Sequence, residues 1–379
     1  MHYDVIVVGL GGMGSATAYQ LARRGQRVLG LEQFTPAHNQ GSSHGYSRII
    51  RQAYLEGSAY VPLLLRAYEL WEQLEHDTSQ SLLTITGGLM IGTPESQVIA
   101  GSLYSAQEHK LDYELLDAQE IHRRYPPLTP TPAIVALYEP KAGFLSPEDT
   151  VQAHLDRAIH LGAELHFEEP VMQWKAADSG DSVQVTTTNA TYSAARLIMT
   201  AGAWTSQVLD ISLPLEVERQ VLYWFNPIGG VAPFAPERFP VYIWQVDEHL
   251  KLYGFPTQNG IPGGVKVAFV RVKSPCTPET IDRSIHPPEV TTIRHCLAAR
   301  IPTLNNTLLH ATTCMYTTTP DHYFVITPHP IHEQVIIASP CSGHGYKFAS
   351  VIGEILADLA VDGATAHQID MFDPARFAT

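Results

Sequence analysis

Three glycines near the start of the chain have the spacing that brings a backbone close to a phosphate group. Gly9, Gly11 and Gly14 form a GxGxxG pattern directly after the apolar run 3–8 (YDVIVV). Small residues at this spacing let a pyrophosphate approach the main chain, and the free N–H groups of the following helix bind its charge. Glu32, at the end of the next strand-like run, can accept hydrogen bonds from ribose hydroxyls. Because the whole pattern fits in about 30 residues, we predict an adenine dinucleotide site. FAD and NAD share the ADP half, and the pattern does not choose between them.

Motifs along nearly the whole chain resemble the monomeric sarcosine oxidase and N-methyltryptophan oxidase family of the glycine/D-amino-acid oxidase superfamily. These motifs are GLGGMG (9–14), GSSHGYSRIIRQAY (41–54), YVPLLLRAYELWEQL (60–74), LYGFP (252–256), TTCMYTTTPDHYFVI (312–326) and SGHGYKFASVIGEILADLA (342–360). The resemblance implies FAD as the cofactor. It also implies oxidation of a secondary or N-methylated amino acid to an imine that water hydrolyses, with O2 reduced to H2O2.

The resemblance further implies that FAD is covalently bound, through a bond from Cys314 to the flavin 8α-methyl carbon. Without it, Cys314 would be interpreted as a small buried hydrophobic residue, as most free cysteines are. The loop 343–345 would direct free N–H groups at the pyrimidine edge, where reduced flavin carries negative charge. Cofactor contacts are expected from Gly9, Gly11, Gly14, Glu32, Ser42, Ser47, Cys314, Gly343, His344, Gly345 and Lys347.

Two cations match family positions that bind the substrate carboxylate, Arg51 and Lys347. A fork-shaped guanidinium and an ammonium both suit a desolvated anion. The alternative for Arg51 is a solvated loop charge, and for Lys347 an exposed position in the first turn of a helix. A cation there opposes the helix dipole, which favours a functional role for Lys347. Tyr253 matches a tyrosine of the family's substrate pocket.

Lys266 in GGVKVAF matches the family's lysine near the flavin, where a fixed cation stabilises the charge that develops as oxygen is reduced. An isolated strand lysine would otherwise be expected to extend its ammonium group to solvent. His44 and Arg48 match residues close to the isoalloxazine ring, where a cation favours reduced, anionic flavin. The alternative for His44 is a loop histidine bonded to the backbone.

One departure from the family concerns the substrate. Sarcosine-type enzymes carry a pocket histidine four residues after the lysine, whereas Val270 occupies that position here and is followed by Arg271. Three alternatives therefore remain open. They are a flavin dehydrogenase that uses another electron acceptor, an NAD(H)-dependent dehydrogenase and a non-catalytic flavin-binding protein.

These residues must be positioned by helices and strands, and the sequence pattern of those elements predicts an α/β protein. A Rossmann-type FAD-binding domain is expected from residues 1–80, 143–214 and 308–379, interleaved with an α+β substrate domain from 81–142 and 215–307 that is built on a mostly antiparallel sheet. Residues 33–51 lack periodicity and are expected to form a long ordered loop. A Gly87-Gly88 turn is expected to join two short strands. Ser146 is expected to cap a helix that runs to Leu161.

Composition excludes several other functions. The 379 residues carry a net charge of −14, which provides no general attraction for nucleic acid or anionic membranes. No apolar run reaches the roughly 18 to 20 residues of a membrane-spanning helix. The four cysteines lack CxxC spacing and the 18 histidines form no HxH or HExxH set, so no metal is predicted. We expect a cytoplasmic protein, and the resemblance favours a monomer.

Overall fold

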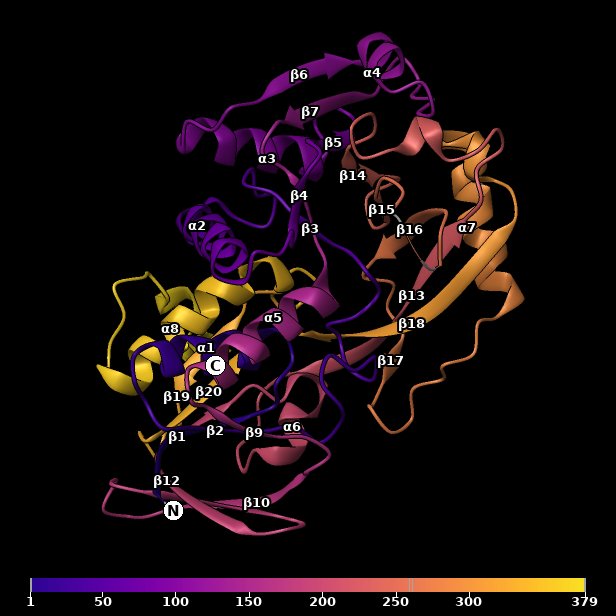
Figure 1. The fold of residues 1–379 in the computed structure, drawn as a ribbon. Coiled ribbons are helices and arrows are strands. Elements are labelled where there is room, and N and C mark those ends of the chain that lie inside the picture. Colours follow the sequence, from indigo (N-terminus) through magenta and orange to yellow (C-terminus); the bar gives the residue numbers. More distant parts are fainter. Residues whose placement is uncertain (1, 259, 261, 378–379) are drawn as a thin grey trace.

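A mainly parallel sheet lies at the centre of the lower half of the molecule in Figure 1. The structure is a computed structural model that describes residues 2–258, 260 and 262–377. Strand β1 (His2–Val8) pairs in parallel with β2 (Val28–Leu31) and β12 (Thr191–Met199), and its apolar residues are buried, as in a strand covered on both faces. The other strands of this sheet are β9 (Glu164–His166), β20 (Val335–Ser339), β19 (Val325–Pro328) and the hairpin of β10 (Val171–Ala176) and β11 (Val183–Thr187).

Helices from distant parts of the chain pack together beside this sheet. Helix α1 (Gly12–Arg23) follows the glycine loop, and both α5 (Pro147–His160) and α8 (Ala349–Val361) pack against it. A Cβ atom on Gly353 of α8 would lie 2.6 Å from the backbone of Ala16, so the two helices are in direct backbone contact. Helix α2 (Val61–Thr78) packs on α8, and α6 (Thr205–Val208) is a single turn. The helix that carries the glycine loop is therefore held by elements from the middle and the end of the chain.

A larger, mostly antiparallel sheet forms the rest of the molecule. Its longest pair is β13 (Glu216–Phe225) with β18 (Leu308–Thr318), and β13 continues through β16 (Val265–Val270) to β15 (Lys251–Gly254). The remaining strands are β14 (Val241–Gln245), β5 (Gly88–Gly92), β7 (Val135–Glu139), β6 (Glu114–Asp117) and β17 (Pro275–Cys276). Helices α3 (Gln97–Glu108), α4 (Ala118–Arg124) and α7 (Pro287–Arg300) cover this sheet, and α7 packs its residues 293, 296 and 297 into the sheet's core.

A small antiparallel sheet lies between these two parts. Strand β8 (Gly143–Leu145) pairs with β3 (Arg48–Ile50) on one side and β4 (Leu83–Ile85) on the other. Figure 1 shows β3 and β4 between the helices of the lower half and the large sheet. Arg48, the first residue of β3, and Ile49 after it both line a large cavity.

The fold class agrees with the sequence prediction, but two local expectations were wrong. The segment 33–51 is not a loop throughout, because its last residues form β3. The turn at Gly87 joins two short strands as predicted, although β4 and β5 belong to different sheets. Ser146 precedes α5 without a capping bond from its hydroxyl. The division into two discontinuous domains stays a prediction. Within the described residues, no helix combines the length and the apolar character that crossing a bilayer requires.

Candidate active site

A cavity of about 360 Å³ connects the glycine loop to a group of buried cations. One end is lined by residues 9–13 and by Glu32, and the other by Arg48, Arg51 and Lys347. Tyr253 of β15 lines the wall that the large sheet contributes. The cavity therefore brings together residues from all three sheets, and it contains most of the residues that the sequence singled out.

The glycine loop has the close backbone packing that its spacing predicted. Gly9 has a left-handed φ of +86°, and a Cβ atom on Gly14 would lie 1.8 Å from the carbonyl oxygen of Gly9. Thr200 at the end of β12 donates its hydroxyl to that same oxygen at 2.8 Å. Helix α1 begins at Gly12, and Gly11 meets only Ser43 Oγ at 3.5 Å from an added Cβ atom. The wall of the cavity at the helix start is thus nearly bare backbone, which fits a pyrophosphate.

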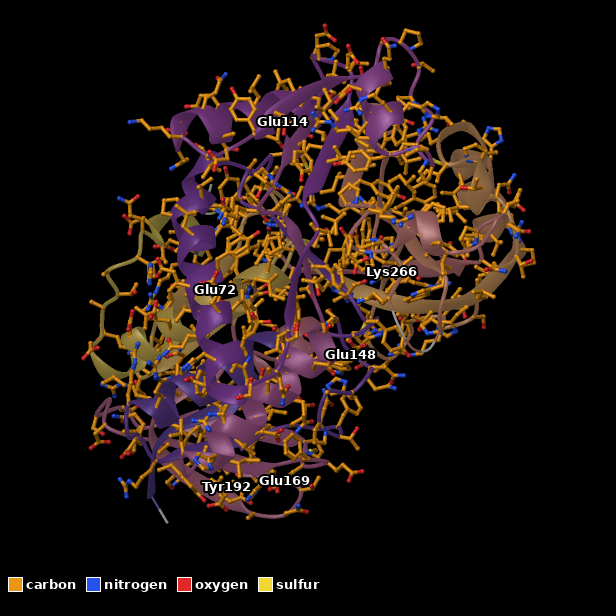
Figure 2. All side chains as sticks on the ribbon, turned by 45° about the horizontal axis from the view of Figure 1, so that its top comes forward. Glu72, Glu114, Glu148, Glu169, Tyr192 and Lys266 are labelled. Carbon is orange, nitrogen blue, oxygen red and sulfur yellow. The ribbon has the colours of Figure 1, made fainter. Side chains whose placement is uncertain are left out.

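Glu32 lies buried at the far end of this loop. Its carboxylate accepts hydrogen bonds from the backbone N–H groups of Leu10 at 2.8 Å and Phe34 at 3.1 Å. A carboxylate has about four acceptor sites, so Glu32 retains capacity for ribose hydroxyls. Glu169 lines the same end of the cavity and accepts a hydrogen bond from the Tyr192 hydroxyl at 2.9 Å. Figure 2 labels these two residues next to each other.

The segment 41–48 is fixed to other elements along its length. Ser42 donates to the Met315 carbonyl of β18 at 2.7 Å, and Ser43 accepts the N–H of Gly12 at 3.0 Å. Glu148, in the first turn of α5, accepts the N–H groups of Gly45 at 2.6 Å and of Tyr46. These bonds explain why a segment without helical or strand periodicity holds a defined shape.

Lys266 on β16 ties the same segment to the large sheet. Its buried Nζ donates to the carbonyls of Gly45 at 2.6 Å and Ser47 at 2.8 Å, and to the Ser47 hydroxyl at 3.2 Å. Burial lowers the pKa of Lys266 well below its ordinary value, and the nearby Arg48 charge lowers it further. The interpretation of Lys266 as a solvent-directed strand lysine is therefore wrong.

Lys266 lines a second cavity instead of the first. This cavity has a volume of about 220 Å³, and Glu148 and Trp224 line it as well. Figure 2 labels Lys266 of β16 and Glu148 of α5, both of which line this cavity. The amino group of Lys266 thus bonds to the segment 45–47 beside a cavity other than the one that contains the glycine loop.

Arg48 lines the large cavity next to the buried Cys314 sulfur, and the buried His44 lies near enough for the Arg48 charge to act on it. Arg48 Nη2 lies 3.6 Å from the Cys314 sulfur and donates to the Ser42 carbonyl at 2.6 Å. Burial lowers the pKa of His44 to about 3, and the charges of Arg48 and Lys266 add to the effect. His44 is therefore neutral at pH 7, and Arg48 is the cation that the structure places here. The Nε2 atom of His44 is buried and has no hydrogen-bond partner among the described residues.

Arg51 and Lys347 lie together at the deep end of the cavity. Arg51 is only 1% exposed and donates to Glu56 at 2.5 Å and to the Ala53 carbonyl at 2.6 Å. Lys347 donates to the His344 carbonyl at 2.6 Å, and burial together with the Arg51 charge lowers its pKa to about 7. Neither residue is the exposed charge that the alternative interpretations described. Lys347 belongs to a 3-10 turn, Tyr346–Phe348, which precedes α8.

The loop 342–345 forms a tight turn against Tyr316. Gly343 has a φ of +74°, and a Cβ atom there would lie 2.7 Å from the Tyr316 ring. A Cβ atom on Gly345 would lie 1.7 Å from the Pro340 carbonyl oxygen. His344 accepts a hydrogen bond at Nδ1 from the Tyr54 hydroxyl at 2.5 Å, while its Nε2 donates to the His322 carbonyl at 3.0 Å.

Among the cavity residues that were not predicted from the sequence are Glu56, Arg271 and Tyr316. Tyr316 lies within the motif 312–326, and Glu56 lies two residues after the motif 41–54. Their positions in or next to these motifs were the signal that could have identified them. Arg271 directly follows Val270, the position at which the sequence differs from sarcosine-type enzymes. A charged residue next to this difference was the signal that could have identified it. In the described part of the chain, no three His, Cys, Asp or Glu side chains are arranged to hold a metal ion.

Comparison with known proteins identifies relatives over the full length. A family model described as FAD dependent oxidoreductase matches residues 4–359. A monomeric sarcosine oxidase of Streptomyces avermitilis is 54% identical over 378 residues, covering 99% of this chain and 98% of that protein. An N-methyl-L-tryptophan oxidase of Yersinia pestis is 33% identical over 384 residues, covering 100% of both.

A solved structure shares the fold. The structure of NikD, an unusual amino acid oxidase essential for nikkomycin biosynthesis, has a TM-score of 0.84 at 26% identity, covering 98% of this chain and 97% of that one. These findings confirm the predicted family, the fold class and FAD as the cofactor. Since the family model matches most of the chain and the cavity carries the residues of a dinucleotide site, the chain belongs to the FAD dependent oxidoreductase family, in the group of monomeric sarcosine oxidases and N-methyltryptophan oxidases.

Proposed function

We propose that this protein is an FAD-dependent oxidase of secondary or N-methylated amino acids. The observation that carries the proposal is the single cavity in which the glycine loop is continuous with Arg51 and Lys347. When bound, FAD supplies the redox chemistry, taking two electrons from the amine and delivering them to O2 as H2O2. The resulting imine hydrolyses in water, and an N-methyl substrate releases formaldehyde.

The protein's own residues supply binding and charge. Arg51 and Lys347 bind the substrate carboxylate, because both are buried cations that line the same end of the cavity. Tyr253 forms a wall of the pocket, and burial, with Tyr316 beside it, raises its pKa, so its hydroxyl stays protonated. Removing the carboxylate from water makes a fork-shaped donor especially effective. These residues orient the amine towards the cofactor.

Lys266 serves the reaction with oxygen. Its amino group is fixed by three hydrogen bonds to the segment 45–47, so in its protonated form it needs no rearrangement to stabilise negative charge. Arg48, beside Cys314, favours the reduced anionic cofactor through its charge. Fixed charges of this kind lower a barrier most effectively where water is excluded.

Covalent attachment of FAD through Cys314 is part of the proposal. The supporting contact is the buried sulfur beside Arg48 and within 3.7 Å of the Ser42 carbonyl. Bond formation removes one hydrogen from the thiol and one from the 8α-methyl carbon, and O2 takes both hydrogens as H2O2.

The test begins with the visible spectrum of the purified protein before and after acid precipitation. Yellow colour that stays with the wild-type pellet and leaves with the supernatant of Cys314→Ser supports the attachment. Colour that leaves with the wild-type supernatant refutes it. A protein without any flavin spectrum would instead support an NAD(H)-dependent dehydrogenase.

The second stage adds a panel of N-methyl and cyclic amino acids without oxygen. Bleaching by an amine, followed by rapid H2O2 formation in air, supports the oxidase. Rapid bleaching with slow H2O2 formation would identify a dehydrogenase that uses another acceptor. A flavin that no amine bleaches would identify a non-catalytic flavin-binding protein.

We also propose that the protein is a cytoplasmic monomer. All four of its cysteines are free, as expected in a reducing compartment. Light scattering during gel filtration should give the mass of one chain, 41.8 kDa. A mass of twice that value would refute the monomer.

A further inference from the structure

Arg271 is a cation of the cavity for which the proposed function has no role. It follows the last residue of β16 and lines the large cavity together with Arg51 and Lys347. Its φ is +53°, a left-handed conformation that is unfavourable for a residue with a long side chain. Backbone strain of this kind persists where the surrounding structure holds it, and it is concentrated at ligand sites.

The guanidinium of Arg271 keeps an unused donor. Its Nε donates to the Ser342 carbonyl at 3.0 Å, which holds the side chain against the loop 342–345. Its Nη2 is buried, yet it has no hydrogen-bond partner among the described residues. Oε1 of Glu56 lies 4.0 Å from Nη2, too far for a hydrogen bond. A buried charged donor left unpaired is costly, so the site favours an acceptor at this atom.

Glu56 lies at ion-pair distance from Arg271, 4.0 Å, but it pairs more closely with Arg51. Its other oxygen accepts from Arg51 at 2.5 Å. Burial would raise the pKa of Glu56, but the nearby cations, with Arg51 first and Arg271 among them, outweigh burial and hold it below its ordinary value. Arg51 and Arg271 therefore share one carboxylate, which balances only one of their two positive charges.

The Arg271 charge also acts on neighbouring basic groups outside the cavity lining. Burial lowers the pKa of Lys251, and the Arg271 charge lowers it further. The pKa of His322 is lowered by the same two causes in the same order. In a chain with a net charge of −14, the region of the cavity around Arg51, Lys347 and Arg271 thus holds three basic side chains beside Glu56. Such a region concentrates anions at the site.

Resting on the proposed function, we propose that Arg271 binds a second acidic group of the substrate. The substrate class is then N-substituted amino acids with an acidic side chain, of the glutamate or aspartate type. Arg51 and Lys347 bind the α-carboxylate, and Arg271 binds the side-chain carboxylate through Nη2. Two separate cationic sites in one cavity suit a dianion better than the single carboxylate of sarcosine.

The experiment compares two substrates of matched shape, N-methyl-L-glutamate and N-methyl-L-glutamine. The holoenzyme should have a kcat/KM for the glutamate derivative that is larger by roughly ten- to a hundredfold, as expected for one charge-assisted hydrogen bond. Arg271→Gln should bring this ratio close to one, and Arg271→Lys should restore part of it. Lys273→Gln is the matched control, because it removes an exposed charge two residues away that does not line the cavity.

Equal or better oxidation of N-methyl-L-glutamine by the wild type would overturn the proposal. So would an Arg271→Gln variant that keeps the wild-type ratio. The dissociation constants of glutarate and valerate, measured by calorimetry, test the same site without turnover. Glutarate should bind the wild type at least roughly tenfold more tightly, and Arg271→Gln should lose that preference. If no amine bleaches the flavin, the proposed oxidase fails, but the glutarate preference still decides the role of Arg271.

Discussion

Lys347 should make carboxylate binding depend on pH near neutrality. Its Nζ is buried beside the rings of Tyr54 and Phe348, with centroids at 5.3 Å and 5.6 Å. Burial is the main cause that lowers its pKa to about 7, and the Arg51 charge adds to it. Glu56 opposes the shift but does not cancel it. The group that binds the carboxylate is therefore a cation only below about pH 7.

The size of the change in carboxylate affinity with pH follows from the fraction of Lys347 that is protonated. With a pKa of about 7, roughly 90% of the lysine is charged at pH 6 and roughly 10% at pH 8. A carboxylate ligand prefers the charged form, so affinity is present below the pKa and is lost as pH rises through it. For butyrate, which stays ionised over this range, the dissociation constant should rise about tenfold from pH 6 to pH 8.

The assay is calorimetric titration of the holoenzyme with butyrate between pH 6 and pH 8. Lys347→Met, which keeps the length without the charge, should bind weakly and show little pH dependence. Glu139 needs its own control, because burial raises its pKa to about 7 as well and it lies near Arg51. Glu139→Gln should retain the wild-type profile. A flat wild-type profile, or one that disappears in Glu139→Gln and persists in Lys347→Met, would refute the assignment to Lys347.

Three further predictions concern the cofactor, the oxygen reaction and stability. Lys266→Met should slow reoxidation of the reduced enzyme by O2 by roughly a hundred- to a thousandfold while anaerobic reduction by substrate changes little, which stopped-flow measurements of the two half-reactions will show. Gly14→Ala should lose both flavin and thermal stability, because its Cβ atom would lie 1.8 Å from the Gly9 oxygen. Gly11→Ala should lose flavin absorbance but fold, since its Cβ atom meets only Ser43 Oγ at 3.5 Å. A flavin-loaded Gly14→Ala would contradict this account of the loop. Tyr54→Phe leaves Nδ1 of buried His344 without its 2.5 Å donor, so urea denaturation should show a loss of about 1–3 kcal/mol. An unchanged unfolding midpoint would show that this bond contributes little.

The parts of the site that could be predicted from sequence are those that depend on local backbone geometry or on ordered motifs. The glycine loop is an example, because a Cβ atom on Gly14 would lie 1.8 Å from the carbonyl oxygen of nearby Gly9. The mostly antiparallel sheet was indicated by strand patterns without helical crossovers. Arg51 and Lys347 were predicted through their motifs, and the structure brings them to one cavity.

The remaining features depend on packing between distant residues. The neutral state of His44 follows from burial beside Arg48 and Lys266, which no local pattern reveals. The position of Lys266 beside the second cavity requires α5 and β16 to hold the same segment, 45–47. Arg271 was visible only as a neighbour of Val270, and its unpaired donor depends on where Glu56 and Ser342 lie.

The order of strands in the parallel sheet has a consequence for how the protein is synthesised. Strand β1 must wait for β12, almost two hundred positions later, and β12 in turn pairs with β20 near the end of the chain. Helix α8, which seats α1, is translated later still. At about 5–20 residues per second, the first strand leaves the ribosome roughly 10 to 40 seconds before β12. Nascent chains therefore expose an apolar strand edge until β12 has been made, and such an edge is prone to pairing with other chains.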